Sequence, residues 1–147
     1  GRTRGREGGS SGWGPPDAGG VEPMVVIDTS ALIDSLTGPK RSAPTLRRLI
    51  AEGERLVVPA LVLYEWWRGP RTEAELRAQE ALIPSATALL FGRTEAKRAA
   101  DLYSLVSRPR GREIDLAIAA CALSIEAPLW TLNRDDFADV PGLLLLD

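Results

Sequence analysis

The sequence predicts an α/β domain with three layers, in which helices lie on both faces of a mainly parallel central sheet. Short apolar runs alternate with longer helical patterns along residues 24–147, as expected of successive βαβ units. The first run, MVVID, has the composition of a short buried strand. Near the C-terminus, EIDLAIAACALSIE is apolar on nearly every face, which indicates a helix buried in the centre of the domain.

Residues 1–23 differ in composition from the rest of the 147-residue chain. They contain eight glycines and three prolines and show no apolar periodicity, so burial could not offset the entropy lost on ordering. We therefore expect a disordered Gly/Pro-rich tail at 1–23 and one folded domain at 24–147.

The first half of that domain predicts strands and helices in alternation. A helix should start at Thr29 or Ser30, either of which can cap it, and Gly53 should end the next helix. Pro59 fits the first position of a third helix, which Gly69 closes. In order, the expected elements are a strand at 24–28, helices at 29–36 and 44–53, a strand at 55–58 and a helix at 60–69.

The second half continues the alternation. Apolar periodicity predicts helices at 72–83 and 92–108, with a short strand near 87–90 between them. The remaining expected elements are the buried helix at 113–126, a strand at 127–132, a short helix at 133–140 and a final strand at 142–146.

The chain has no histidine, and this excludes several kinds of catalytic site. A Ser-His-Asp triad, a Cys-His pair, a zincin motif and any histidine base are ruled out, so the chemistry must depend on carboxylates. The one cysteine, Cys121, lies in the buried helical pattern and fits core packing. No apolar run exceeds about eight residues, against the roughly 20 of a membrane helix, so we expect a cytoplasmic protein with no membrane contact.

Four acidic residues lie where ligands of a parallel sheet gather, outside the carboxyl ends of the strands. Asp28 follows the first strand and Glu65 lies in the helix after the second. Asp115 opens the buried helix, and Asp136 follows the strand at 127–132. Each also has an ordinary explanation, because Asp28 could cap a helix, Asp115 would suit any first helical turn, and the other two could be solvated surface acids.

Together these segments resemble the PIN-domain family, through the phrases VVIDTSALIDSL, VPALVLYEWWRG and REIDLAIAACALSIEAPLWTLNRDDFADVPGL. The resemblance runs from Met24 to the C-terminus, with the motifs in the family's order. It implies a catalytic, metal-binding site made of Asp28, Glu65, Asp115 and Asp136, with Ser30 and Asn133 as polar groups beside the metal ligands. Some members carry an acid at the position of Asn133, so Asn133, Asp135 and Asp136 remain alternatives for the fourth group.

By the same resemblance, the chain is similar to the VapC-like ribonuclease toxins of bacterial toxin–antitoxin pairs. That similarity implies an endoribonuclease whose partners are RNA, a cognate antitoxin and a second copy of the chain in a homodimer. Arg68 and Arg112 are candidate contacts for RNA phosphates, because a guanidinium suits bidentate phosphate binding.

A site of this kind needs a cation. Four converging carboxylates would repel one another by roughly 1 kcal/mol per pair in water, and by about 4 at an effective dielectric constant of 20. Oxygen ligands without histidine or cysteine suit Mg²⁺ or Mn²⁺ rather than zinc. The residues leave open whether one metal or two would bind.

Two rival functions are weaker. A dehalogenase-like phosphotransfer enzyme also uses an aspartate after its first strand, but it needs a second aspartate where this chain has Ser30. It also needs a late lysine, and none follows Lys97. The other rival is a catalytically silent PIN-like binding module, and the retention of four costly like charges argues against it.

Overall fold

The computed structural model describes residues 23–147. The tail expected at 1–23 therefore lies outside the described residues, apart from Pro23. Pro23 belongs to the folded part, because its carbonyl accepts a hydrogen bond of 2.8 Å from the backbone N–H of Arg55.

The described residues form a parallel sheet with the strand order β2-β1-β3. β1 (Met24–Ile27) lies between β2 (Arg55–Val57) and β3 (Leu129–Trp130). Val26 stands opposite Val57 on one side and Leu129 on the other. Because the strands are parallel, the residues that follow all three strands meet at the same edge of the sheet.

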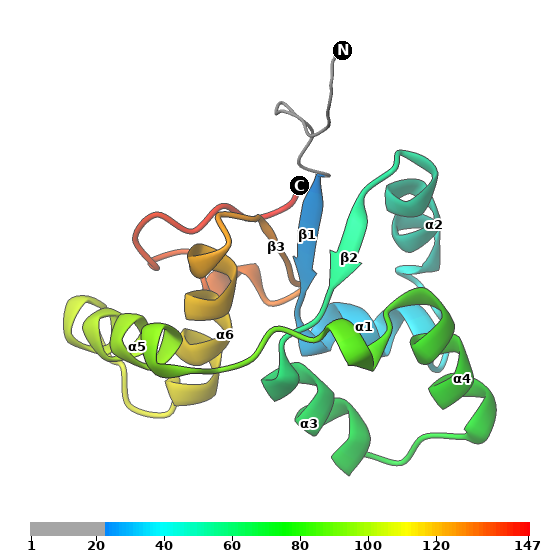
Figure 1. Cartoon of the computed structure of the whole chain (residues 1–147), viewed down its shortest axis with the longest axis horizontal. Helices are drawn as coiled ribbons and strands as arrows, with labels where there is room; N and C mark the ends of the chain where they lie inside the picture. Colours follow the sequence, from blue (N-terminus) through cyan, green and yellow to red (C-terminus); the bar gives the residue numbers. More distant parts are fainter. Residues whose placement is uncertain (1–22) are drawn as a thin grey trace, which may run out of the picture.

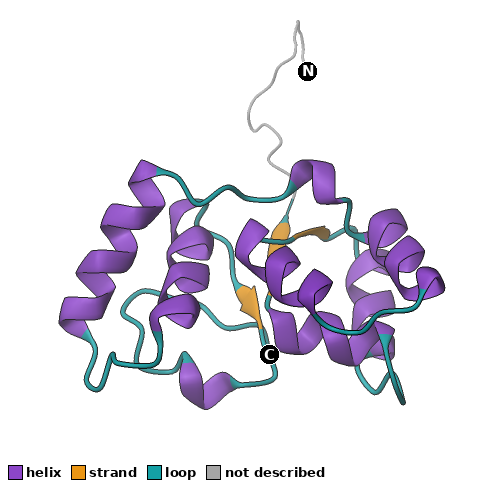
Figure 2. Cartoon of the chain, turned by 90° about the horizontal axis from the view of Figure 1, so that it is seen from below, coloured by secondary structure: helices purple, strands orange, loops and turns teal. Residues whose placement is uncertain are grey.

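Helices flank this sheet from two sides, which confirms the predicted three-layer architecture. α6 (Glu113–Ser124) and α5 (Arg93–Leu105) pack together on one side of the strands, as Figure 1 shows. Seen from below in Figure 2, the strands lie between two groups of helices. The other helices are α1 (Thr29–Leu36), α2 (Ala43–Ala51), α3 (Ala60–Arg68) and α4 (Glu73–Leu82). α3 contacts both α1 and α6, and so lies between the two groups.

The core is built from the central strand and the central helix. Val26 and Ile27 of β1 are fully buried, and so is the run 116–122 of α6, which confirms the prediction of a buried helix. Cys121 lies in this run, and burial raises the pKa of its thiol to about 11. Cys121 is 1% exposed, which confirms its predicted place in the core.

Two of the predicted strands do not form. Residues Ser85–Thr87 make a 3₁₀ turn, η1, and Leu89 makes only a single bridge to Pro59, because α3 begins directly after Pro59. The predicted strand at 142–146 is likewise one bridge, from Leu145 to Leu129. It cannot extend toward Ala127, whose N–H already bonds to the carbonyl of Ala122 at the end of α6.

The predicted caps also need correction. Asp28 is the N-cap of α1, and its side chain makes no capping bond, so neither Thr29 nor Ser30 caps the helix. Pro59 is likewise the N-cap of α3 rather than its first helical residue. Gly53 does end α2, with a φ of +82° that favours glycine.

The short helix expected at 133–140 is reduced to a 3₁₀ turn, η2 (Arg134–Asp136). Phe137 follows this turn and is only 1% exposed, so its ring anchors the turn to the core. Within residues 23–147, no helix combines the length and the apolar character that crossing a bilayer demands.

The two phenylalanines of the chain provide a matched test of this anchoring. Phe137→Ala should lower the free energy of unfolding by about 3–5 kcal/mol, because it empties a fully buried site. Phe91→Ala should cost clearly less, since Phe91 is 40% exposed. Equilibrium unfolding in urea measures both, and equal losses would contradict the burial of Phe137.

Candidate active site

Asp28 occupies the carboxyl end of the central strand. Its backbone N–H donates to the carbonyl of Trp130 at 2.9 Å, which continues the pairing of β1 with β3 one residue beyond the strand. The side chain is only 3% exposed. Burial raises the pKa of this carboxyl group, and hydrogen bonds from neighbouring groups offset part of the rise. The site is therefore built around a carboxylate withdrawn from bulk water.

Two hydroxyl groups hold Asp28. Thr131 Oγ1 donates to Asp28 Oδ2 at 2.7 Å, and Ser30 Oγ donates to the same oxygen at 3.2 Å. Ser30 Oγ also accepts from the backbone N–H of Leu132 at 3.0 Å, while Thr131 Oγ1 accepts from that of Asn133. The loop after β3 is thus tied to the carboxylate that ends β1.

Glu65 approaches the same edge of the sheet from α3. Its Oε1 accepts a hydrogen bond of 2.5 Å from Thr29 Oγ1, the first residue of α1. Its Oε2 lies 3.6 Å from Arg68 Nη2, one turn along α3. The Glu65 side chain is 21% exposed, and its bond to Thr29, the residue after Asp28, places this carboxylate at the carboxyl edge of the sheet.

Asp115 connects the acidic residues electrostatically. It lies half-buried in the first turn of α6, and burial is the largest cause that raises its pKa to about 6. The negative charges of Asp28, Asp136 and Glu65 raise the pKa further, whereas the Arg112 guanidinium lowers it. The charges of the other three predicted acids therefore act on Asp115, although 87 positions of sequence separate Asp28 from Asp115.

Asp136 is exposed in η2 and lines an open pocket of about 390 Å³ together with residues 132–135. Its charge acts on Asp115, which distinguishes it from its neighbour Asp135. Asn133 also lines this pocket, and its backbone N–H donates a hydrogen bond to Thr131 Oγ1.

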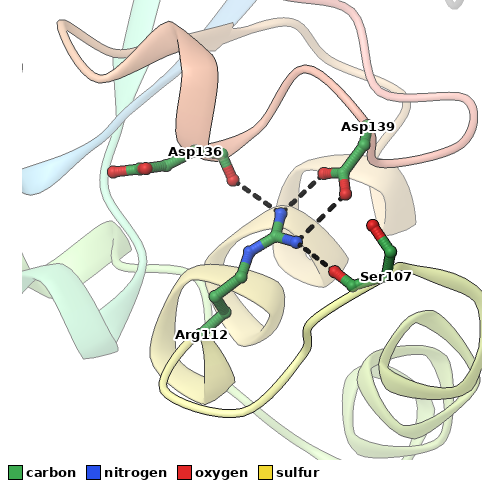
Figure 3. A network of polar contacts seen from close by, with 4 residues as sticks. All are labelled: Ser107, Arg112, Asp136 and Asp139. Atoms are coloured by element: carbon green, nitrogen blue, oxygen red, sulfur yellow. Dashed lines mark hydrogen bonds and ion pairs between the residues drawn. The ribbon is translucent and has the colours of Figure 1, made fainter.

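The two arginines expected near the RNA differ in their surroundings. Arg68 is exposed, and its guanidinium lies over the ring of Tyr64 and beside Glu65. Arg112 is instead turned inward, toward Asp139 and the backbone carbonyl of Asp136 (Figure 3). The geometry of Arg112 fits an internal contact better than a contact with substrate.

The carboxylates do not form a closed cage. In the part of the chain from Pro23 onward, no three acidic or cysteine side chains are arranged to ligate one ion directly. Hydrated Mg²⁺ does not require such a cage, because it keeps several waters and binds through one or two carboxylates. The all-oxygen donor set and its unbalanced negative charge therefore fit a hydrated divalent cation.

Sequence reasoning missed three residues that shape this site. Thr29 and Thr131 supply the hydroxyl donors to Glu65 and Asp28, and Asp139 pairs with Arg112. Both threonines lie in the motifs that carry the family resemblance. Thr29 directly follows Asp28, and Thr131 begins the tripeptide TLN. Their role depends on the β1–β3 register and on the docking of α3 beside α1, which local sequence does not specify.

Comparison with known proteins identifies the family. The family model described as PIN domain matches residues 25–143. Over 124 residues the chain is 36% identical to Ribonuclease VapC19 of Mycobacterium tuberculosis, covering 82% of this chain and 97% of that protein.

Solved structures share the fold. The structure of VapBC2 from Rickettsia felis bound to a DNA fragment from their promoter matches with a TM-score of 0.67 at 19% identity, over 84% of this chain and 97% of that one. VapBC-1 from nontypeable Haemophilus influenzae matches with a TM-score of 0.63 at 23% identity, over the same shares of the two chains. With its carboxylates at the carboxyl edge of a parallel sheet and a family match over nearly its whole folded part, this chain belongs to the PIN-domain family.

Proposed function

We propose that this protein is a divalent-metal-dependent endoribonuclease that acts as the toxin of a toxin–antitoxin pair. The observation that carries the proposal is the buried Asp28 carboxylate at the carboxyl edge of the sheet, where Glu65 bonds to Thr29 and where the charges of Asp28, Glu65 and Asp136 act on Asp115. Perturbed carboxyl groups of this kind are typical of functional sites. The similarity to a relative named Ribonuclease VapC19 supports RNA as the substrate.

Asp28, Glu65, Asp115 and Asp136 would hold the metal, directly or through water. Mg²⁺, with Mn²⁺ able to replace it, would activate a water molecule for attack on a phosphodiester and neutralise charge that develops on the phosphate oxygens. Asp136 is the most exposed of the four and would serve as the outer ligand.

The polar residues around the acids would fix their orientation. Thr131 and Ser30 donate to Asp28 Oδ2 and so fix the orientation of this carboxylate. Thr29 orients Glu65 through Oε1, while Glu65 Oε2 lies beside Arg68. Asn133 lines the pocket beside Asp136 and would contribute its amide to bound water or substrate. Asp115 would release a proton when the cation binds.

Substrate would approach from the exposed side of this edge. Arg68 is 59% exposed in its side chain and lies beside Glu65, so its guanidinium would contact an RNA phosphate near the metal. Action on cellular RNA would place the protein in the cytoplasm.

Protein partners would bind the apolar surface of α3. Trp66 is fully buried, whereas Trp67 is 52% and Tyr64 59% exposed, since successive helical residues point about 100° apart. Exposed aromatic side chains are typical of interfaces. A solved structure of similar fold is described as a toxin-antitoxin complex from Klebsiella pneumoniae, which supports a cognate antitoxin as one partner. A second copy of the chain in a homodimer would be the other.

A catalytically silent PIN-like module is the alternative function. It would keep the fold and the partner surface without needing a cation. The mutual repulsion that raises the pKa of Asp115 destabilises the folded protein, and a module without catalysis would gain nothing from retaining it.

Asp28→Asn is the first test. The variant should lose RNA cleavage in Mg²⁺ or Mn²⁺, as wild type should on adding excess chelator, because a neutral amide binds a cation poorly. The stability of the folded protein should be unchanged or higher, because the substitution removes a buried negative charge but keeps an acceptor for Thr131.

Asp101→Asn is its matched control, because Asp101 lies exposed on α5 and pairs with Lys97. Cleavage of a structured RNA mixture and circular dichroism measure the two properties. A folded Asp28→Asn protein with full activity would overturn the assignment, and wild type that binds no divalent metal would favour the silent module.

The neighbouring acids of η2 allow a second test. Asp136→Asn should reduce cleavage by about tenfold or more, because Asp136 is the acid of this turn whose charge reaches Asp115. Asp135→Asn removes the same charge from the adjacent residue and should leave cleavage near wild type. If Asp135→Asn gave the larger loss, the fourth site group would be Asp135.

The raised pKa of Asp115 predicts how pH acts on folding and on metal binding. In the unfolded chain the pKa of Asp115 is near 3.8. The raised pKa in the folded protein therefore contributes stability that is fully present below pH 3.8, and this contribution is lost as the pH rises through about 6. Cation binding has the opposite dependence and should strengthen as the pH rises through about 6.

Calorimetric titration with Mn²⁺ should show affinity about tenfold lower at pH 5 than at pH 7.5, because a group with a pKa of about 6 is roughly 90% protonated at pH 5. Asp115→Asn should bind Mn²⁺ more weakly and with a smaller pH dependence. Wild-type affinity that did not change between these pH values would contradict the link between Asp115 and the cation.

A further inference from the structure

The guanidinium of Arg112 makes four hydrogen bonds to groups from two loops (Figure 3). Nη2 donates to Asp139 Oδ1 at 2.6 Å and to the backbone carbonyl of Asp136 at 2.8 Å. Nη1 donates to Asp139 Oδ2 at 3.0 Å and to the backbone carbonyl of Ser107 at 3.1 Å. This fork geometry fixes both the position and the plane of the guanidinium.

These bonds connect the start of α6, which carries the half-buried Asp115, with η2, which carries the exposed Asp136. Arg112 is the N-cap of α6, three residues before Asp115. Asp139 lies three residues after Asp136, beyond the short 3₁₀ turn. One ion pair therefore bridges two segments that are more than 20 residues apart in sequence and that each supply one carboxylate.

Arg112 contacts the backbone of Asp136 and leaves its side chain free to point elsewhere. Figure 3 shows its backbone carbonyl pointing toward Arg112 and its carboxylate pointing away. The turn is a three-residue 3₁₀ element with exposed side chains, held by the buried ring of Phe137 and by a hydrogen bond from Arg134 to the carbonyl of Leu146. The bond from Arg112 fixes the peptide group next to the carboxylate, and so the direction in which the carboxylate leaves the backbone.

We infer that Arg112 and Asp139 form a positioning pair that holds the Asp136 carboxylate in place relative to Asp115. Asp139 has a second effect, since it occupies the guanidinium and keeps it from forming ion pairs with Asp115 or Asp136. Both acids thereby stay available to a cation. This inference rests on the proposed function, because it assigns a role in forming the metal site of that nuclease.

The sign of the effect separates positioning from simple electrostatics. A positive charge close to a cation site weakens cation binding, so removing Arg112 would tighten binding if charge alone mattered. If Arg112 positions Asp136, its removal should weaken binding, by about tenfold as found for groups that orient metal ligands. The two explanations thus predict changes in opposite directions.

The experiment compares the full chain with Arg112→Gln, Arg112→Lys and Asp139→Asn, using Mn²⁺ alone as the probe. Mn²⁺ affinity should fall about tenfold in Arg112→Gln, and a comparable fall in Arg112→Lys would show that the fork geometry, rather than the charge, is required. Asp139→Asn should also lose affinity, because the released guanidinium can then pair with Asp115 or Asp136. Arg110→Gln is the matched control, since it removes the same charge from an exposed position in the same loop.

A double variant tests whether Arg112 acts through Asp136. Arg112→Gln should add nothing further to the loss of affinity caused by Asp136→Asn. Additive losses, or tighter Mn²⁺ binding in Arg112→Gln alone, would overturn the inference.

A readout without metal keeps this inference separate from the proposed function. In the metal-free protein, amide hydrogen exchange at residues 135–140 should be faster in Arg112→Gln than in Arg110→Gln. Unchanged exchange would refute the positioning role even if wild type binds Mn²⁺ and cleaves RNA. Wild type that binds no Mn²⁺ would instead refute the nuclease proposal, and with it the role of the pair in metal binding.

Discussion

The buried carboxylate of Asp28 is the constraint on which the rest of the site depends. A negative charge that is 3% exposed needs hydrogen-bond donors, and the fold supplies them as the hydroxyls of Thr131 and Ser30. Thr131 reaches Asp28 because β3 pairs directly with β1, and Ser30 because α1 begins one residue after Asp28. The sheet order and the start of α1 are therefore part of the chemistry of the site as well as of its architecture.

The acids differ in how they are held, and the difference follows their burial. Asp28 and Glu65 receive hydrogen bonds from hydroxyl groups, which carry no net charge, and Glu65 also lies beside the Arg68 guanidinium. Asp136 is exposed on a short turn, and it is held through its backbone by an arginine whose own charge is balanced by Asp139. In both cases the positioning groups leave negative charge available at the centre of the site.

That surplus of negative charge is a cost to the folded protein. Asp115 has its pKa raised to about 6 by burial and by its acidic neighbours, so ionising it near neutral pH opposes folding. Asp28 follows β1 and Asp115 lies in α6, and both of these elements contribute many buried residues to the core. Like charges are thus fixed on elements that are anchored in the core.

The amino-acid sequence alone was enough to predict the fold class, the buried central helix, the burial of Cys121 and the candidate acids at the edge of the sheet. These follow from apolar periodicity, residue type and motif order, which are local properties. It also predicted strands near 87–90 and at 142–146 that the structure reduces to single bridges, because strand extension depends on hydrogen-bonding groups that other elements already use. Three contacts could not be predicted in this way: Thr131 donates to Asp28, Thr29 donates to Glu65, and Arg112 pairs with Asp139. Those contacts join residues 27 to 103 positions apart, and such distances are closed by packing rather than by any local pattern.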